Sequence, residues 1–321
     1  MMHETGTTLE IDIAALQTFE DGLDPVHPEA SAVPATILAY GEISAVLALP
    51  FQPGVVFKRM CGFPDAAAAQ THQAAVETYI AQLRAIGLTV PATRVITMRN
   101  RHGEHVFYVA QERAAKESIG NAYLRNATGA QLEAALRAVL DAVIRVWTFN
   151  RDNCDGIALG LDAQISNWRL VEGPNGAMEV AYFDVATPLM RRDGQEIMDV
   201  RMLIKSLPAP LRWTIEALFL EEVVQRYYDL HLVLSDLAGN FHKEGYPEKI
   251  DPAIALIDRH LAEAAPGLLE KPLDRKTIDA YYRRDKWIWI IFLEFRKWHR
   301  ALYTKILRKR YPFILPGKIR R

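Results

Sequence analysis

The first third of the chain alternates short apolar runs with tight turns. Gly41 and a turn at residues 52–54 separate three of the runs, and two more flank a polar turn at residues 100–103. Short β-prone segments joined by tight turns are typical of antiparallel strands. The pattern predicts an antiparallel sheet from residues 35–40, 43–49, 55–60, 95–99 and 105–110.

Helical periodicity dominates the rest of the chain. An alanine-rich stretch at residues 66–86 follows a capping residue, Asp65, and stops at Gly87. Residues 128–150 carry apolar side chains at intervals of three and four, which is typical of an amphipathic helix. Further helices are expected around residues 7–23, 211–237, 251–263 and 275–310, with a short β-like patch between 158 and 184. The fold class predicted is α+β.

Composition excludes several classes of protein. The 321 residues are 50% apolar and 24% charged, with a net charge of −1, so the chain is neither disordered nor fibrous, and no specific nucleic acid partner is predicted. Two cysteines cannot form a disulfide scaffold, and the first residues lack the apolar core of a signal peptide. We therefore expect a cytoplasmic protein, with peripheral membrane contact as an open alternative.

Charge is distributed unevenly along the chain. Residues 271–321 hold 16 basic and four acidic side chains, a net charge of +12, while the remainder carries −13. Such a segment either docks on the acidic body of the protein or contacts an external anionic surface, for which residues 296–321 are the candidates. The aromatic segment at 287–310 has the same two interpretations, a buried helix or a membrane-interface helix, and we expect burial.

Five polar side chains form the only pattern with catalytic meaning. Lys58 ends the third apolar run, and Glu77 lies in the middle of the following predicted helix. Asp162 and Asn167 are five residues apart in a loop, and Asp184 ends a β-like run. No phosphate-binding loop of the Walker type, dinucleotide fingerprint, nucleophile elbow or zinc motif occurs in the sequence.

This order of residues resembles the protein-kinase-like superfamily, and it is closest to the aminoglycoside and choline kinase relatives. The resemblance covers about residues 35–190 in specific motifs and the helical remainder only in general layout. It implies a bilobal protein-kinase-like fold, with a small antiparallel β-sheet N-lobe holding one helix and a large, mainly helical C-lobe. The implied organisation is an acidic N-terminal extension at 1–33, an N-lobe at 34–112, and a C-lobe with a basic tail at 113–321.

The resemblance also implies a role for each side chain. Lys58 would grip ATP phosphates and pair with Glu77, Asp162 would be the catalytic base, and Asn167 and Asp184 would bind Mg²⁺. Gly41 and Ser44 would cap a phosphate, and the backbone of Gln111 and Glu112 would hold the adenine. The implied activity is ATP- and Mg²⁺-dependent transfer of a phosphoryl group to a hydroxyl of a small-molecule acceptor.

Departures from the family pattern keep a second hypothesis open. The glycine-rich loop is reduced to residues 41–44 and contains Glu42, Gly160 replaces a histidine, and Gln164 replaces a cationic helper. A catalytically inactive pseudokinase that serves as a binding or scaffold module fits these losses. In the plainest interpretation, Lys58 and Glu77 form a surface ion pair, and Asp162 and Asn167 are loop-turn residues.

Overall fold

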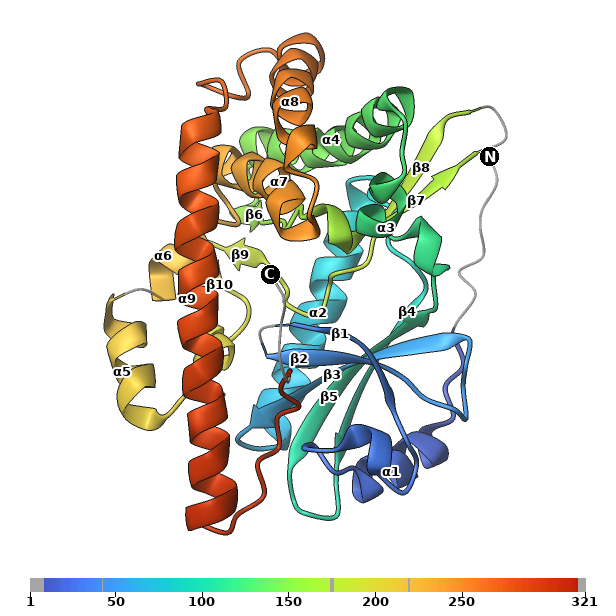
Figure 1. The fold of residues 1–321 in the computed structure, drawn as a ribbon, viewed down its shortest axis with the longest axis vertical. Coiled ribbons are helices and arrows are strands. Elements are labelled where there is room, and N and C mark those ends of the chain that lie inside the picture. Colours follow the sequence, from blue (N-terminus) through green and yellow to red (C-terminus); the bar gives the residue numbers. More distant parts are fainter. Residues whose placement is uncertain (1–8, 42, 174–175, 219, 317–321) are drawn as a thin grey trace.

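The computed structural model describes residues 9–41, 43–173, 176–218 and 220–316. The chain folds as a mixed α+β protein in which an antiparallel sheet adjoins a mainly helical region (Figure 1). The five-stranded sheet has the order β1-β2-β3-β5-β4, and all its neighbouring strands are antiparallel. Its strands are β1 (Thr36–Tyr40), β2 (Ser44–Ala48), β3 (Val55–Phe63), β4 (Thr93–Arg99) and β5 (His105–Glu112), as the apolar runs predict.

Strand β3 lies in the centre of the sheet and divides its side chains between two cores. Phe57 and Cys61 belong to the core on the outer face, whereas Met60 belongs to the core shared with the helical region. Because successive side chains of a strand point to opposite faces, Lys58 and Arg59 project in opposite directions. Lys58 reaches a cavity beside the helical region, and Arg59 is buried under the outer face.

Helix α2 (Ala66–Ala85) covers the inner face of the sheet. Asp65 caps it by accepting a hydrogen bond from the backbone of Ala68, and Gly87, with a φ of +85°, follows its end. The buried face of the helix carries Val76, Tyr79 and Leu83, which pack into the larger core. The pattern of residues 66–86 therefore predicted both the helix and its limits.

Segments from both ends of the chain cover the outer face. Helix α1 (Ile13–Gly22) contributes Leu16 and Phe19, and the C-terminal segment contributes Tyr311 and Phe313, to one buried core with Phe57. The described part of the N-terminal extension, residues 9–33, is thus packed against the sheet that follows it. Part of the basic C-terminal segment likewise docks on the protein itself, since Arg310 forms an ion pair with Glu104 at 3.3 Å.

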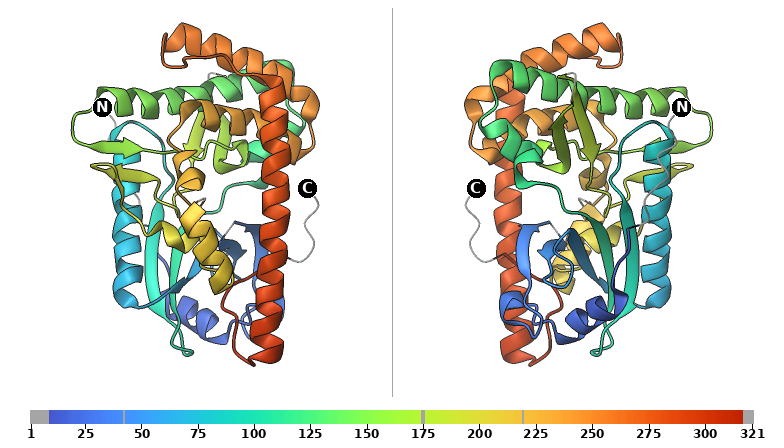
Figure 2. Two further views of the ribbon diagram at one scale, coloured as in Figure 1. Left: turned by 90° about the vertical axis from the view of Figure 1, so that its left-hand side faces the viewer. Right: turned by 90° about the vertical axis from the view of Figure 1, so that its right-hand side faces the viewer.

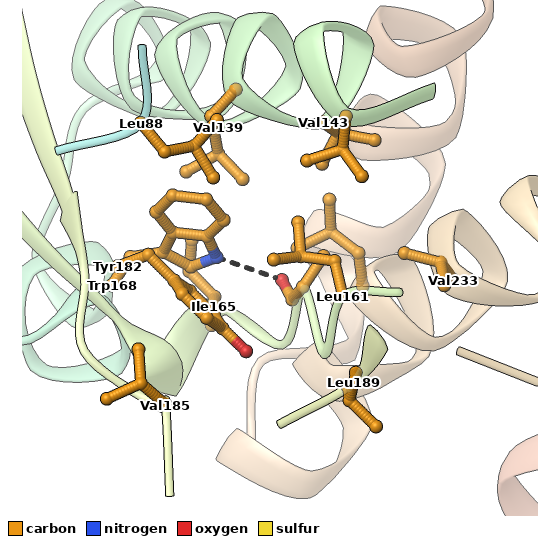
Figure 3. Close-up of a cluster of buried hydrophobic side chains, with 14 of the residues drawn as sticks. Leu88, Val139, Val143, Leu161, Ile165, Trp168, Tyr182, Val185, Leu189 and Val233 are labelled. Atoms are coloured by element: carbon orange, nitrogen blue, oxygen red, sulfur yellow. Dashed lines mark hydrogen bonds between the residues drawn. The ribbon is translucent and has the colours of Figure 1, made fainter. Parts of the chain in front are cut away.

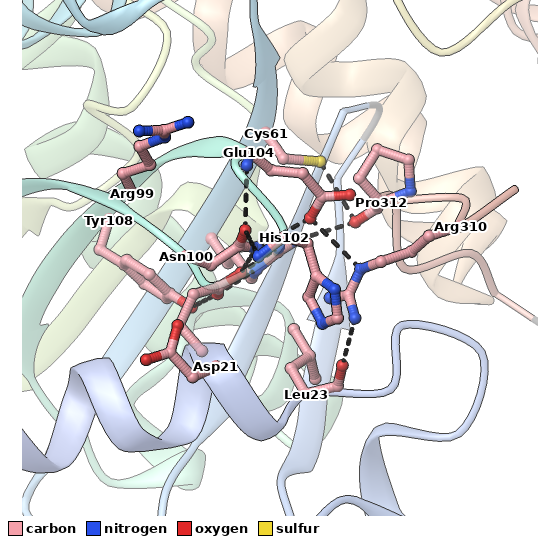
Figure 4. A network of polar contacts seen from close by, with 12 residues as sticks. Asp21, Leu23, Cys61, Arg99, Asn100, His102, Glu104, Tyr108, Arg310 and Pro312 are labelled. Carbon is pink, nitrogen blue, oxygen red and sulfur yellow. Dashed lines mark hydrogen bonds and ion pairs between the residues drawn. The ribbon is translucent and has the colours of Figure 1, made fainter.

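Polar contacts join these segments to the sheet (Figure 4), and Arg59 and Glu20 form a buried ion pair. Arg59 donates from Nε and Nη2 to the two carboxylate oxygens of Glu20 at 2.8 and 2.7 Å, and from Nη1 to the carbonyl of Pro312 at 2.9 Å. Asn100 and Tyr108 also donate to Glu20. Burial opposes ionisation of Glu20, but the attraction of Arg59 and these hydrogen bonds outweigh it and lower the pKa of the carboxyl.

The helical region is built around α4 (Gly129–Asp152), which Thr128 and Gln131 cap reciprocally. Helices α7 (Leu230–Glu244) and α8 (Ile250–Ala264) pack with it in the larger core, and α9 (Arg275–Ala301) extends along one side, from this region past the sheet (Figures 1 and 2). The shorter helices are α3 (Gly120–Arg125), α5 (Ala209–Leu218) and α6 (Leu220–Gln225). Two small sheets complete the helical region. One has the order β10-β9-β6, from β6 (Ile157–Leu159), β9 (Met190–Arg192) and β10 (Gln195–Glu196), and the other pairs β7 (Trp168–Glu172) with β8 (Met178–Tyr182).

The expected burial of the 287–310 segment is wrong. One side of α9 is buried through Ile278, Leu293 and Arg296, but Trp287 and Trp298 are 66% and 59% exposed. The reason is that a single helix packed along one side of a globular body buries only the stripe that faces it. No helix in the described part of the chain combines the length and apolarity needed to cross a bilayer.

Replacing Glu20 should destabilise the fold strongly. Glu20→Gln leaves Arg59 buried without its counter-charge, so we expect the free energy of unfolding at neutral pH to fall by roughly 3 kcal/mol. Because folding lowers the pKa of Glu20, the stabilisation is present above the unfolded pKa of about 4.3 and is lost as pH falls through the folded value. The difference in the free energy of unfolding between the wild type and Glu20→Gln, measured by urea titration, should therefore be smaller at acidic pH. Asp152→Asn, at the exposed Arg151–Asp152 pair, is the matched control and should leave stability unchanged. Equal stability of Glu20→Gln and the wild type at neutral pH would contradict the assigned role.

Candidate functional site

A cavity of about 380 Å³ lies between the sheet and the helical region. Strands β1 to β3 contribute Ala39, Val46 and Lys58, and the loops around Asp162 and Asp184 contribute the polar wall. Side chains of α7 and α9 complete the lining, among them Asp236, Asn240, Lys243, Tyr281 and Trp289. Elements more than 200 residues apart in the sequence therefore meet at this cavity.

Lys58 and Asp184 form an ion pair within the cavity. The ammonium group of Lys58, on β3, donates to Oδ1 of Asp184, which follows β8. Both side chains keep about a fifth of their surface exposed, at 21% and 22%. The predicted phosphate clamp and the predicted metal ligand are therefore neighbours, 126 residues apart in the sequence.

The loop that carries Asp162 is held by the hydrophobic core (Figure 3). Leu161 and Ile165 are fully buried, and the indole of Trp168 donates to the carbonyl of Ala163 at 3.2 Å. Between these anchors, Asp162 and Asn167 line the cavity, and Nδ2 of Asn167 donates to the carbonyl of Asp162 at 3.1 Å. Alternation of buried and cavity-lining positions fixes both polar side chains at one wall.

The two loops are also joined to each other and to α2. Phe183 donates its backbone N–H to the carbonyl of Asn167 at 3.2 Å. From α2, His72 donates from Nε2 to the carbonyl of Ala186 at 3.0 Å, and Tyr79 donates its hydroxyl to the carbonyl of Gly160 at 2.9 Å. Burial lowers the pKa of His72 to about 4, so the ring is neutral at physiological pH. Helix α2 therefore holds both loops through side chains that the sequence did not single out.

Glu77 does not pair with Lys58. It lies on the exposed face of α2 and accepts a hydrogen bond from Gln73 at 2.9 Å, one turn away. The rotation of α2 is set by its apolar face, so residues 76, 79 and 83 point inward and residue 77 points out. The assignment of Glu77 as the anchor of Lys58 is therefore wrong, and Asp184 occupies that place.

The predicted nucleotide contacts reach the cavity only in part. Gly41 and Ser44 line it at the β1–β2 turn, where the Gly41 N–H donates to the Ser44 carbonyl at 3.0 Å. Glu42 lies outside the described residues, as does the 174–175 part of the turn expected between β7 and β8. Gln111 and Glu112 end β5, and neither is among the described residues that line the cavity. The Gln111 side chain bonds to Thr93 at 3.0 Å, and Glu112 is exposed.

Helix α7 adds polar residues to the cavity that sequence reasoning missed. Asp236, Asn240 and Lys243 are spaced by four and three residues and therefore share one helical face. Gln164 connects them, since its amide donates to Asp236 at 2.8 Å and accepts from Lys243 at 2.9 Å. A polar stripe in an otherwise apolar helix was the available signal.

Arg226 balances the acidic side chains of this wall. Its guanidinium lies 3.7 Å from the carboxylate of Asp236 and 3.4 Å from that of Asp285 on α9. The Gly160 backbone is also closed in here, since a Cβ on it would come within 3.0 Å of the Tyr227 carbonyl. A side chain at this position would require Tyr227, Tyr228 or Leu189 to shift by a few tenths of an ångström.

The electrostatics of the cavity are dominated by carboxylates. Burial raises the pKa of Asp162 to about 7, and the negative charges of Asp236 and Asp184 contribute, while Arg226 opposes them. A carboxyl in this state exchanges its proton near neutral pH. In the described part of the chain, no three His, Cys, Asp or Glu side chains cluster closely enough to hold a metal ion by themselves.

Comparison with known proteins gives the family. A family model described as a family of unknown function, DUF6206, matches residues 34–300. The chain belongs to the DUF6206 family. The match includes every side chain named above at the cavity and leaves out α1 and the C-terminal segment that cover the sheet. A search of curated proteins finds no significant match to this DUF6206 member.

Removing the charge of Asp162 should stabilise the protein at alkaline pH. Because folding raises the pKa of this carboxyl to about 7, wild-type stability is fully present below the unfolded pKa and is lost as pH rises through the folded value. The side chain of Asp162→Asn cannot ionise. The free energy of unfolding of this variant should therefore be about 1–3 kcal/mol higher than that of the wild type near pH 8 and equal to it near pH 4. Urea titrations at both pH values measure this, with Asp152→Asn as the control for loss of an exposed charge. A variant that is no more stable than the wild type at pH 8 would exclude the raised pKa.

Proposed function

We propose that this protein is an ATP- and Mg²⁺-dependent phosphotransferase that acts on a hydroxyl group of a small molecule. One observation carries the proposal. Lys58, Asp162, Asn167 and Asp184, which come from three separate segments of the chain, all line the same cavity. A surface ion pair and isolated turn residues would have no reason to converge in this way.

The proposed architecture is bilobal and kinase-like. The five-stranded sheet with α2 would be the small lobe, and the region from α3 to α9 would be the large lobe, with the cavity between them. The position of the cavity supports this division, because its lining comes from β1 to β3 on one side and from α7 and α9 on the other. The hydrogen bonds of His72 and Tyr79 would transmit the position of α2 to the catalytic loops.

The donor set fits a nucleotide with its metal ion. Asp184 offers a carboxylate, and Asn167 offers its amide oxygen, because its amide nitrogen is used by the Asp162 carbonyl. These hard oxygens suit Mg²⁺, which takes its remaining ligands from phosphate and water. Bound Mg²⁺ would neutralise phosphate charge. Lys58 would exchange part of its contact with Asp184 for a phosphate oxygen, and Ala39, Ile43 and Val46 would provide an apolar surface for the base.

Asp162 would act on the acceptor. With a pKa of about 7 it can take the proton of a hydroxyl group at physiological pH, and positioning of that hydroxyl supplies much of the rate enhancement. Lys243, which contacts Gln164, would supply the cation that the kinase-like pattern has at residue 164. Its charge is available to stabilise the transferred phosphoryl group.

A second candidate is a pseudokinase that binds ligands without turnover. The exposed position of Glu77 and the direct Lys58–Asp184 pair favour it, since both differ from the arrangement that the resemblance implies for an active site. The two candidates share the fold and the cavity. They differ in whether Asp162 is required for turnover, which can be measured separately from binding.

Nucleotide binding should depend on Asp184 and Lys58 but not on Glu77. We expect Mg²⁺-ATP to raise the melting temperature of the wild type, and Asp184→Asn or Lys58→Met to reduce its affinity at least about tenfold by removing a metal ligand or a phosphate contact. Glu77→Gln, on the exposed face of the same lobe, is the matched control and should bind normally. Differential scanning fluorimetry with and without Mg²⁺ provides the measurement. No stabilisation of the wild type by any nucleotide with Mg²⁺ would refute the proposal.

Turnover should separate the two candidates. In a screen of hydroxyl-bearing acceptors with radiolabelled ATP, Asp162→Asn should keep nucleotide affinity and lose phosphoryl transfer by about a hundredfold or more. The wild-type rate should rise with pH as Asp162 loses its proton. Nucleotide binding without transfer or hydrolysis in the wild type would favour the pseudokinase instead.

A further inference from the structure

One face of α9 exposes a stripe of large apolar side chains. Trp287, Ile291 and Trp298 are spaced by four and seven residues, with Ile288 and Phe295 beside them, so all five lie along one side of the helix. Their exposed fractions are 66%, 51%, 59%, 53% and 41%, respectively. We call these five residues the α9 stripe. Scattered exposed apolar residues are ordinary, but five contiguous ones on one helix face mark an interaction surface.

The opposite face of α9 belongs to the protein itself. Tyr281, Tyr282, Asp285 and Trp289 line the cavity, and Leu293 and Arg296 are buried. The exposure of the stripe therefore does not result from a detached helix. Figures 1 and 2 show α9 along one side of the molecule, spanning the level of both the helical region and the sheet.

The chain beyond α9 exposes a second apolar group among basic residues. In the basic turn, residues 305–309, Ile306 is 71% and Leu307 is 47% exposed, and Lys305, Arg308 and Lys309 are exposed around them. The turn is fixed on both sides. A π-helical turn, Leu302–Ile306, continues α9 into it, and after it the Arg310–Glu104 ion pair and the Tyr311 hydrogen bond to the Ser206 carbonyl at 3.0 Å hold the chain on the body.

Charge decides what this surface binds. Apart from the buried Arg296, residues 283–309 hold eight basic and two acidic side chains, a net charge of +6, and basic residues lie at both ends of the stripe. A second copy packed on the stripe, parallel or antiparallel, would bring these cations together and be repelled. Tryptophans with lysines and arginines around an apolar stripe are suited to the headgroup level of an anionic bilayer, where the rings insert and the cations meet phosphate.

We propose that the α9 stripe and the basic turn form a docking surface for an anionic lipid bilayer. The helix lies in the plane of the interface, with Trp287 and Trp298 inserted among the acyl chains and the basic turn among the headgroups. This inference is independent of the proposed function, since no residue of the stripe or the turn lines the cavity within the described part of the chain.

Vesicle flotation with the full-length chain tests the proposal. The wild type should bind vesicles of phosphatidylcholine with about one third phosphatidylserine, bind phosphatidylcholine vesicles at least about tenfold more weakly, and lose binding at high salt. Brominated lipids should quench tryptophan fluorescence in the bound state. Equal binding to both kinds of vesicle, or no binding to either, would overturn the proposal.

Two double variants separate the apolar and the electrostatic contributions. Trp287→Ser with Trp298→Ser should weaken binding to anionic vesicles by about tenfold or more and remove most of the quenching. Lys305→Glu with Lys309→Glu should have a similar effect on binding, whereas Arg113→Glu with Lys116→Glu, the same change of charge at another exposed site, should have little. All the exchanged side chains are exposed, so circular dichroism should show an unchanged fold.

Competing partners give distinct results. If the stripe joins two copies of the chain, sedimentation velocity would show a wild-type dimer that the tryptophan double variant converts to a monomer. If the basic turn binds nucleic acid instead, RNA would bind in the absence of vesicles, and the tryptophan double variant would bind it normally. Either result, with vesicle binding unaffected by the tryptophan double variant, would overturn the lipid assignment.

Discussion

The alternation of side chains along strand β3 is the constraint on which both halves of the structure depend. Lys58 and Arg59 are adjacent in sequence, and the pleat of the strand sends one to the cavity and the other to the outer face. Lys58 meets Asp184 from the helical region, and Arg59 meets Glu20 and the Pro312 carbonyl. A one-residue shift of register would exchange the two cations and disrupt both sites.

Both cations have partners far away in the sequence, but their surroundings differ. Arg59 and Glu20 are almost completely buried, at 3% and 0% exposure, and every neighbour fixes them in a single geometry. Lys58 and Asp184 keep contact with the cavity, so their pairing can be exchanged for other ligands. Adjacent residues of one strand thus provide a structural ion pair and an exchangeable one.

The parts of the site that the sequence predicted depend on local pattern. Lys58 and Asp184 were recognisable because Lys58 lies within a strand-like run and Asp184 follows one, and Asp162 and Asn167 because they share one loop. Glu77 was misassigned because its role came from resemblance, although apolar residues at 76, 79 and 83 already indicated which face of α2 is buried. The polar stripe of α7 indicates that Asp236 and Lys243 share a helical face, but only the packing of distant segments brings them and Arg226 to the cavity. The exposure of α9 depends equally on what lies beside it.

The closing of the outer face by the C-terminal segment has a consequence for how the protein is made. The hydrogen bond between Arg59 and Pro312 spans 253 residues, and Tyr311 and Phe313 complete the core beneath α1. Native contacts of such high sequence separation form late and slow folding. During synthesis, one apolar face of the sheet therefore stays incompletely covered until residues 310–315 have left the ribosome. This incompletely covered sheet exposes apolar side chains of the kind that chaperones bind.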